Sequence, residues 1–239
     1  MSPDEQVRYG LPQRGRRSAL LRPRPVLSVL PDTLTRHTIP SEGRSLMSVT
    51  AGCEPRPQLT AALDQVEAQI EATGPGDLDR PTPCAGYEVR TLLAHLVAVL
   101  RKLTVANKGG DTTSVPDPAD DLTGDAGQAF HRARVDLELV WGPDADLDEN
   151  YTMAWGTMTG RELLEAYAHE FTVHSWDLAR ATGRGDDLDP ALARAALEWF
   201  SQNVPAEGRG EGGPFAAPIA VPDDADPYTR LAAYVGRSA

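Results

Sequence analysis

The amino-acid sequence predicts an all-α fold, a four-helix bundle with extra C-terminal helices and a short hairpin or extended turn before the fourth helix. Three observations lead to this prediction. Four long segments repeat apolar residues at the spacing of one helix face. Glycine, proline and capping residues mark the ends of those segments. The connections between them have the ordinary to long lengths that link neighbouring helices of a bundle.

Apolar stripes predict the first two helices. The first helix follows Pro57, a residue favoured at a helix start, and ends at the Gly-Pro-Gly run of 74–76. Its apolar residues recur three or four positions apart, at Leu59, Leu63, Val66 and Ile70. The second helix is expected over about 88–107, before a pair of glycines. Its broad stripe contains Val89, Leu92, Leu93, Leu96, Leu100 and Leu103.

The third helix is expected from about Leu122 to Trp141, where a Gly-Pro pair stops it. Its stripe contains Ala126, Ala129, Phe130, Ala133, Leu137 and Val140. Between 151 and 157, larger side chains alternate with small polar ones, which is typical of a short hairpin or extended turn.

Capping residues bound the fourth helix. Thr159 and Glu162 have the spacing of a capping box, in which each side chain bonds a free backbone N–H at the helix start. The helix is expected to reach about Thr182, with Gly183 as a left-handed cap. A fifth helix is expected after Asp189, then a loop over 205–222 and a last short helix that begins at 226–227.

Composition excludes several functional classes. The 239 residues include 23 basic and 35 acidic side chains, a net charge of −12, which disfavours nucleic-acid binding. No apolar run is long enough to cross a membrane. Two cysteines, Cys53 and Cys84, cannot form a disulfide framework, so we expect a reducing compartment, the cytoplasm.

The chain divides near Met47. Residues 1–46 contain eight arginines, four acidic residues and six prolines without a helical period, so they are predicted to be a disordered basic arm. An over-extended reading frame that truly starts at Met47 is the alternative. Residues 47–239 carry the remaining charge, −16, and are predicted to form one helical domain.

Two polar residues interrupt the apolar face of the predicted fourth helix. At about 100° per residue, Glu170 and His174 lie about 40° apart inside the stripe. A buried carboxylate needs a cationic partner, because desolvating its charge costs several kcal/mol. Residues four apart lie on adjacent turns, so one metal ion could bind both. An intrahelical hydrogen bond is the alternative interpretation.

His95 is the candidate third ligand, because it lies at the edge of the apolar stripe of the second helix. Two histidines and one glutamate are the ligand set of a catalytic zinc, which keeps a fourth position open. Nickel and iron(II) also accept these ligands. An ordinary core histidine at His95 and a metal-free bundle remain open.

Other polar residues have two interpretations each. Asp177 either accepts the second ring N–H of His174, which would fix the tautomer of that ring, or is a surface carboxylate. Cys84 precedes a helix N-terminus, which favours a reactive thiol, although packing is the simpler role. An acidic cluster is expected to solvate a loop and helix start, at Asp117, Asp120, Asp121 and Asp125.

Two sequence runs resemble a known family. The run PTPCAGYEVR at 81–90, followed by LLAHLV at 92–97, and the run EFTVHSWDLARATG at 170–183 resemble signatures of the mycothiol-dependent maleylpyruvate isomerase N-terminal, metal-binding domain family. This family lies within the DinB-like superfamily. The turn at 155–156, the loop at 215–222 and the end at 231–236 resemble an uncharacterised metal-binding subgroup. The resemblance covers about 57–236.

This resemblance implies a DinB-like four-helix bundle with one divalent metal ion. The family's ligands fall on His95, Glu170 and His174 of this sequence. The implied function is a metal-dependent enzyme that acts with a low-molecular-weight thiol and an electrophilic substrate, in thiol transfer or isomerisation. Zinc is the expected metal. The alternative is a non-catalytic metal-binding bundle with a structural, sensing or ligand-binding role.

Overall fold

The computed structural model describes residues 54–122, 124–207, 209 and 215–238, so the predicted arm at 1–46 and the alternative start at Met47 lie outside the described residues. The described part is mostly helical, as predicted. Its helices are α1 (Arg56–Glu71), α2 (Val89–Asn107), α3 (Ala126–Val140), α4 (Gly160–Thr182), α5 (Pro190–Asn203) and α6 (Pro227–Tyr234). Short 3-10 turns are η1 (Pro75–Asp77), η2 (Thr112–Ser114) and η3 (Gly185–Asp187).

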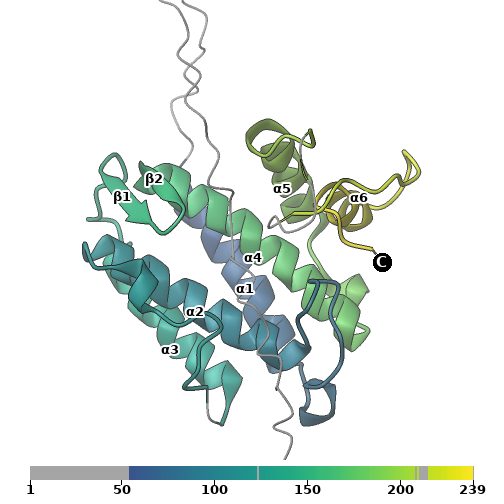
Figure 1. The fold of residues 1–239 in the computed structure, drawn as a ribbon, viewed down its shortest axis with the longest axis horizontal. Helices are drawn as coiled ribbons and strands as arrows, with labels where there is room; N and C mark the ends of the chain where they lie inside the picture. Colours follow the sequence, from purple (N-terminus) through teal and green to yellow (C-terminus); the bar gives the residue numbers. More distant parts are fainter. Residues whose placement is uncertain (1–53, 123, 208, 210–214, 239) are drawn as a thin grey trace, which may run out of the picture.

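Helices α1 to α4 pack around one hydrophobic core (Figure 1). In this group α1 lies against α4 and α2 lies against α3. The largest side chains of this core with almost no exposed surface include Leu63, Leu92, Leu96, Leu100, Leu103, Phe130, Leu137, Leu163, Leu164, Phe171 and Leu178. The apolar stripes predicted from the sequence therefore face one another in the structure.

A second, smaller core lies on another side of α4. There α5 and α6 pack against each other and against α4, with Phe200, Leu231 and Val235 among the buried residues (Figure 1). Helix α4 thus belongs to both cores. This explains why its buried residues extend all round the helix rather than along one stripe.

The predicted hairpin is a small antiparallel sheet of β1 (Asn150–Met153) and β2 (Gly156–Thr159), so the fold is not strictly all-α. Tyr151 pairs with Met158, and Tyr151 and Met153 point into the core. The ring of Tyr151 also packs on that of Trp141, with centroids 4.6 Å apart. The sheet therefore joins the end of α3 to the start of α4.

Helix α3 begins later than its apolar pattern predicted, at Ala126 rather than about Leu122. The Asp125 side chain accepts a hydrogen bond from the backbone N–H of Gln128 at 3.2 Å, as a helix cap does. Gly124 has φ of +104°, a conformation outside the right-handed helix. The cap therefore sets the helix start, although Leu122 still packs against the core.

The ends of α4 match the prediction. Thr159 and Glu162 form the capping box, with the Glu162 carboxylate accepting from Thr159 N at 2.8 Å. Gly183 has φ of +76° and ends the helix in the left-handed conformation. These two ends give α4 a defined length of 23 residues, and the candidate site lies in its interior.

Candidate metal centre

The three predicted ligands meet in the interior of the molecule. His95 projects from α2, and Glu170 and His174 project from successive turns of α4. One ligand atom of each lies within 4.8 Å of one ligand atom of each of the others. Their exposed fractions are 2% for His95, 8% for Glu170 and 6% for His174. All three therefore lie on helices and not on loops.

The two imidazole rings turn the same ring nitrogen toward Glu170. Nε2 of His95 lies 3.4 Å from Oε1 of Glu170, and Nε2 of His174 lies 3.8 Å from the same oxygen. The ring centroids of the two histidines are 5.1 Å apart at an angle of 77°. The geometry therefore brings two nitrogens and one carboxylate oxygen toward a single point.

The opposite nitrogens of both rings bond to aspartates. Nδ1 of His95 lies 2.8 Å from Oδ1 of Asp117, and Nδ1 of His174 lies 2.9 Å from Oδ2 of Asp177. An ionised carboxylate only accepts hydrogen bonds, so each Nδ1 carries a proton. In a neutral ring Nε2 then has a lone pair, which faces Glu170. The two Nε2 atoms and Oε1 of Glu170 are then three hydrogen-bond acceptors that face one another. A cation between them would offset their mutual repulsion.

A proton is one cation that meets this need, and a divalent metal is the other. Burial opposes a charge on His95, but its hydrogen bonds with Asp117 and Glu170 outweigh burial and raise its pKa to about 9. Burial likewise opposes the Asp117 charge, yet His95 and Lys102 hold the pKa of that carboxyl far below its ordinary value. The site therefore attracts positive charge strongly.

Each aspartate also has a basic side chain behind it. Nζ of Lys102 lies 2.7 Å from Oδ2 of Asp117, and Nε of Arg237 lies 3.4 Å from Oδ1 of Asp177. Two series of contacts therefore run in the same order, from a basic side chain to a carboxylate to an imidazole ring: Lys102, Asp117 and His95 in one, and Arg237, Asp177 and His174 in the other. This matters for ligation, because a carboxylate behind a metal-binding histidine fixes its tautomer and orientation.

Comparison with known proteins identifies the family. The sequence profile of the Mycothiol maleylpyruvate isomerase N-terminal domain matches residues 59–179. The chain belongs to this family. Two uncharacterised proteins of Mycobacterium tuberculosis, one from each of two strains, are each 30% identical to it over 178 residues, which cover 74% of this chain and 94% of theirs. A crystal structure of the mycothiol-dependent maleylpyruvate isomerase is 18% identical with a TM-score of 0.45, covering 66% of this chain and 75% of that chain.

All three predicted ligands and Asp177 lie inside the region that matches the Mycothiol maleylpyruvate isomerase N-terminal domain family.

The prediction for the acidic cluster needs a correction. Asp117 does not solvate the loop as predicted, because its carboxylate is buried against His95 and Lys102. Asp121 is exposed and pairs with Arg101 at the surface, in line with the prediction. One member of the cluster thus supports the candidate site.

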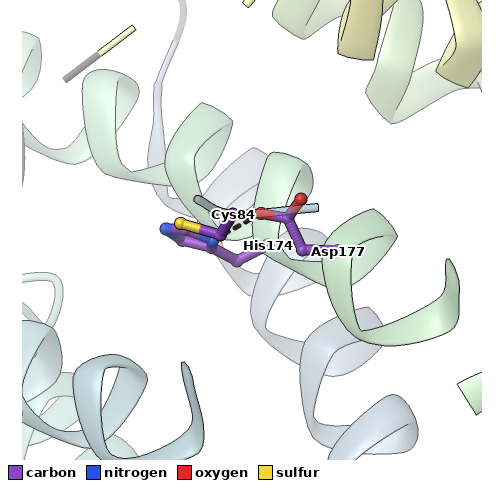
Figure 2. A group of neighbouring side chains, drawn as sticks. All are labelled: Cys84, His174 and Asp177. Carbon is purple, nitrogen blue, oxygen red and sulfur yellow. Dashed lines mark hydrogen bonds and ion pairs between the residues drawn. The ribbon is translucent and has the colours of Figure 1, made fainter. Parts of the chain in front are cut away.

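A second group of potential ligands in this family member consists of Cys84, His174 and Asp177, shown in Figure 2. Its Asp177 carboxylate already has a positive partner, because Arg237 lies 3.4 Å from it. Nη2 of Arg237 also lies 3.4 Å from Sγ of Cys84. The guanidinium therefore supplies the charge that a second metal would bring, and this group does not need one.

The Cys84 thiol itself stays protonated at neutral pH. Burial raises its pKa to about 12, and the nearby Arg237 only partly opposes that effect. A thiol in this state is a weak nucleophile. The structure therefore favours the packing role of Cys84 over the reactive one.

His169, the neighbour of Glu170, points away from the candidate site. Its ring packs on those of Trp199 and Phe200 of α5, with centroids 5.1 and 6.4 Å apart. Burial lowers its pKa to about 4, so the ring is neutral at physiological pH.

Among the described helices, none is long and apolar enough to span a membrane.

Proposed function

We propose that this chain binds one divalent metal ion through His95, Glu170 and His174 and works as a metal-dependent enzyme with a low-molecular-weight thiol. One observation supports this proposal above the others. The Nε2 atoms of two histidines and one carboxylate oxygen converge inside the protein, while both Nδ1 atoms are bonded to aspartates. The residues present thus fit a metal ion by their donor chemistry.

The proposed ion is zinc, and nickel and iron(II) would accept the same ligands. Two imidazoles and a carboxylate match the three-ligand set of catalytic zinc sites. Among the described residues, the group around Glu170 contains three potential ligands and no fourth. A site of this kind keeps a position for a substrate atom, whereas a structural zinc has four protein ligands.

The fold we propose for α1 to α4 is the DinB-like four-helix bundle.

When bound, a divalent ion at this position would lower the pKa of a thiol and so favour the thiolate. The chain's own residues prepare the site. Asp117 and Asp177 hold the imidazole rings with Nε2 toward Glu170. The Glu170 carboxylate adds a negative charge, which favours a cation between the rings. Burial keeps water away, which strengthens each of these electrostatic interactions.

The thiol is proposed from the family description, which names mycothiol. The reaction class is thiol transfer to an electrophile, or isomerisation of one. The reducing cytoplasm is the proposed setting, because a thiol-dependent reaction and a chain with two cysteines both suit it.

The single domain predicted for 47–239 stays a prediction, which the packing of α5 and α6 on α4 supports.

Metal analysis of purified protein tests the first half of the proposal. We expect one zinc per chain in the wild type and in His131→Ala, a control that removes an exposed histidine of α3. We expect much less than one in His95→Ala and His174→Ala. Equal, sub-stoichiometric metal in all four proteins would overturn the metal site.

A thiol assay tests the second half. Zinc-loaded protein is mixed with mycothiol and the alkylating agent iodoacetamide, and consumption of mycothiol is followed. We expect the wild type to accelerate alkylation and Glu170→Gln to lose that effect. Full metal binding with no effect on the thiol would favour the alternative, a non-catalytic metal-binding bundle.

A further inference from the structure

Arg237 reaches the candidate site from the C-terminal end of the described chain. Helix α6 ends at Tyr234, and Gly236 then turns the chain with φ of +76°. The backbone N–H of Arg237 donates to the carbonyl of Ala232 at 2.8 Å, as in a helix-ending motif. This turn directs the chain back toward α4.

The turn leaves no room for a side chain at position 236. A Cβ atom added to Gly236 would lie 2.6 Å from Cβ of Ala216 and 2.8 Å from its backbone carbonyl atoms. The backbone of Ile219 donates to the carbonyl of Ala233, which ties the preceding loop to α6. The positive φ and this close approach both require glycine at 236. The position of Arg237 is therefore set by its surroundings and not by its own side chain alone.

The guanidinium of Arg237 contacts both oxygens of one carboxylate. Nε lies 3.4 Å from Oδ1 of Asp177, and Nη2 lies 3.4 Å from Oδ2. Asp177 has no exposed surface, and the Arg237 side chain is one-tenth exposed. A carboxylate buried this deeply is costly unless its charge is compensated. Arg237 provides that compensation from a segment 60 residues away in sequence.

The same carboxylate oxygen has a second role. Oδ2 of Asp177, which contacts Arg237, also accepts the hydrogen bond from Nδ1 of His174 at 2.9 Å. Figure 2 shows this bond between the His174 ring and Asp177, with Cys84 beside them. The orientation of the carboxylate plane is thus set by Arg237 on one side and by His174 on the other. A substitution of Arg237 would therefore alter the orientation of the His174 ring by way of Asp177.

We propose that Arg237 is a positioning residue of the metal centre, which acts through Asp177 to keep Nε2 of His174 directed at Glu170. This inference rests on the proposed metal site and extends it to the segment after α6, beyond residue 179, where the family match ends. It assigns that segment a function besides covering the second core. Its hydrogen bonds go to Asp177 and Cys84 rather than to a predicted ligand, so it reaches the His174 ring through Asp177, while its charge also interacts with that of Glu170.

The test compares Arg237→Gln, Arg237→Lys and the control Arg230→Gln, which changes an exposed arginine of the preceding helix α6. Affinity for Co²⁺ is measured by competition with a chelator, together with the visible absorption of the bound ion. We expect Arg237→Gln to bind about 10- to 100-fold more weakly, the usual effect of losing a group behind a ligand. Arg237→Lys should recover part of the loss, because it restores the charge but not the two-pronged contact. Arg230→Gln should match the wild type.

A second measurement follows the ring directly in the metal-free protein. Nitrogen-15 NMR of the histidine side chains reports which nitrogen of His174 carries the proton. We expect the Nδ1–H form in the wild type and a mixture of the two tautomers in Arg237→Gln, a change that a merely structural ion pair would not produce. If that variant fails to fold, Arg237→Lys takes the same test.

The outcomes separate the two proposals. A wild type that binds no Co²⁺ would overturn the metal site and, with it, this role of Arg237. A wild type that binds Co²⁺ tightly, with unchanged affinity and unchanged His174 nitrogen shifts in Arg237→Gln, would overturn the role of Arg237 alone.

Discussion

Asp117 accepts a hydrogen bond from Nδ1 of His95 at 2.8 Å, although 22 positions separate the two residues in sequence. The loop that carries Asp117 packs over α2, where the backbone N–H of Ala119 donates to the carbonyl of Ala94. Lys102, seven residues after His95, reaches the other oxygen of Asp117 from the same helix. The loop between α2 and α3 is therefore part of the candidate site and not only a connection.

Substitution Asp117→Asn tests this relationship. The amide keeps the shape of the carboxylate but loses the charge that pairs with Lys102 and holds the His95 ring. We expect affinity for zinc to fall about 10- to 100-fold, measured by chelator competition. The control is Asp121→Asn, which changes an exposed carboxylate of the same loop that pairs with Arg101. Equal affinities in both variants would show that Asp117 does not support His95.

The parts of this site that could be predicted from sequence lie on helices. A helix repeats every 3.6 residues, so the positions of Glu170 and His174 follow from the apolar residues around them. The same argument places His95 at the edge of its stripe, and the structure brings these three residues within 4.8 Å. Metal binding by these three residues stays a prediction.

Supporting residues outside helices gave no such signal. Asp117 lies in a bend where no period applies, and one acidic residue in a group looks like the others. Arg237 follows the last helix, and its contact with Asp177 depends on how α6 packs on α4. The start of α3 was misplaced for a related reason, because Leu122 continues the apolar spacing although Asp125 caps the helix.

Zinc should stabilise the folded chain. A ligand that binds the native state stabilises it by about 2.7 kcal/mol when present at 100 times its Kd. We expect thermal unfolding of the wild type and of His131→Ala to shift upward with added zinc. His174→Ala should show no comparable shift, because it removes one of the convergent acceptors. A zinc-independent melting temperature in the wild type would contradict the proposed site.

Gly160 should tolerate no larger residue, because the first turn of α4 lies against the rings beside it. A Cβ added there would lie 2.9 Å from the Trp141 ring, 3.0 Å from the Tyr151 ring and 3.2 Å from the Leu147 backbone. Overpacking of this kind costs about 1–3 kcal/mol, more than the better helix propensity of alanine returns. Gly160→Ala should therefore lower the free energy of unfolding in urea titrations.

The matched control for that variant is Gly76→Ala in η1, where an added Cβ meets no heavy atom within 4 Å. That change should be neutral or slightly stabilising, because alanine restricts the unfolded chain. Equal stability of Gly160→Ala and the wild type would mean that the rings beside α4 rearrange freely.

The N-terminal cap of α6 stabilises the helix that precedes Arg237. The Asp226 side chain accepts from the backbone N–H groups of Tyr228 and Thr229 at 3.0 and 3.1 Å. Removing such a cap costs about 1 kcal/mol, so Asp226→Ala should unfold at a lower temperature at pH 7. Asp224→Ala, which changes an exposed residue of the same loop, is the control and should melt with the wild type.

The pH dependence of that difference follows from the charge of the cap. Burial opposes the Asp226 charge, but its hydrogen bonds with Thr229 and Tyr228 together outweigh burial and hold the pKa of the carboxyl below its ordinary value of 3.8. A lowered folded pKa means that the ionised cap stabilises the protein above the unfolded pKa and that this contribution is lost as the pH falls through the folded value. The gap in melting temperature between the wild type and Asp226→Ala should therefore narrow below about pH 4. A gap that stays constant down to pH 2 would show that the carboxylate charge contributes nothing to the cap.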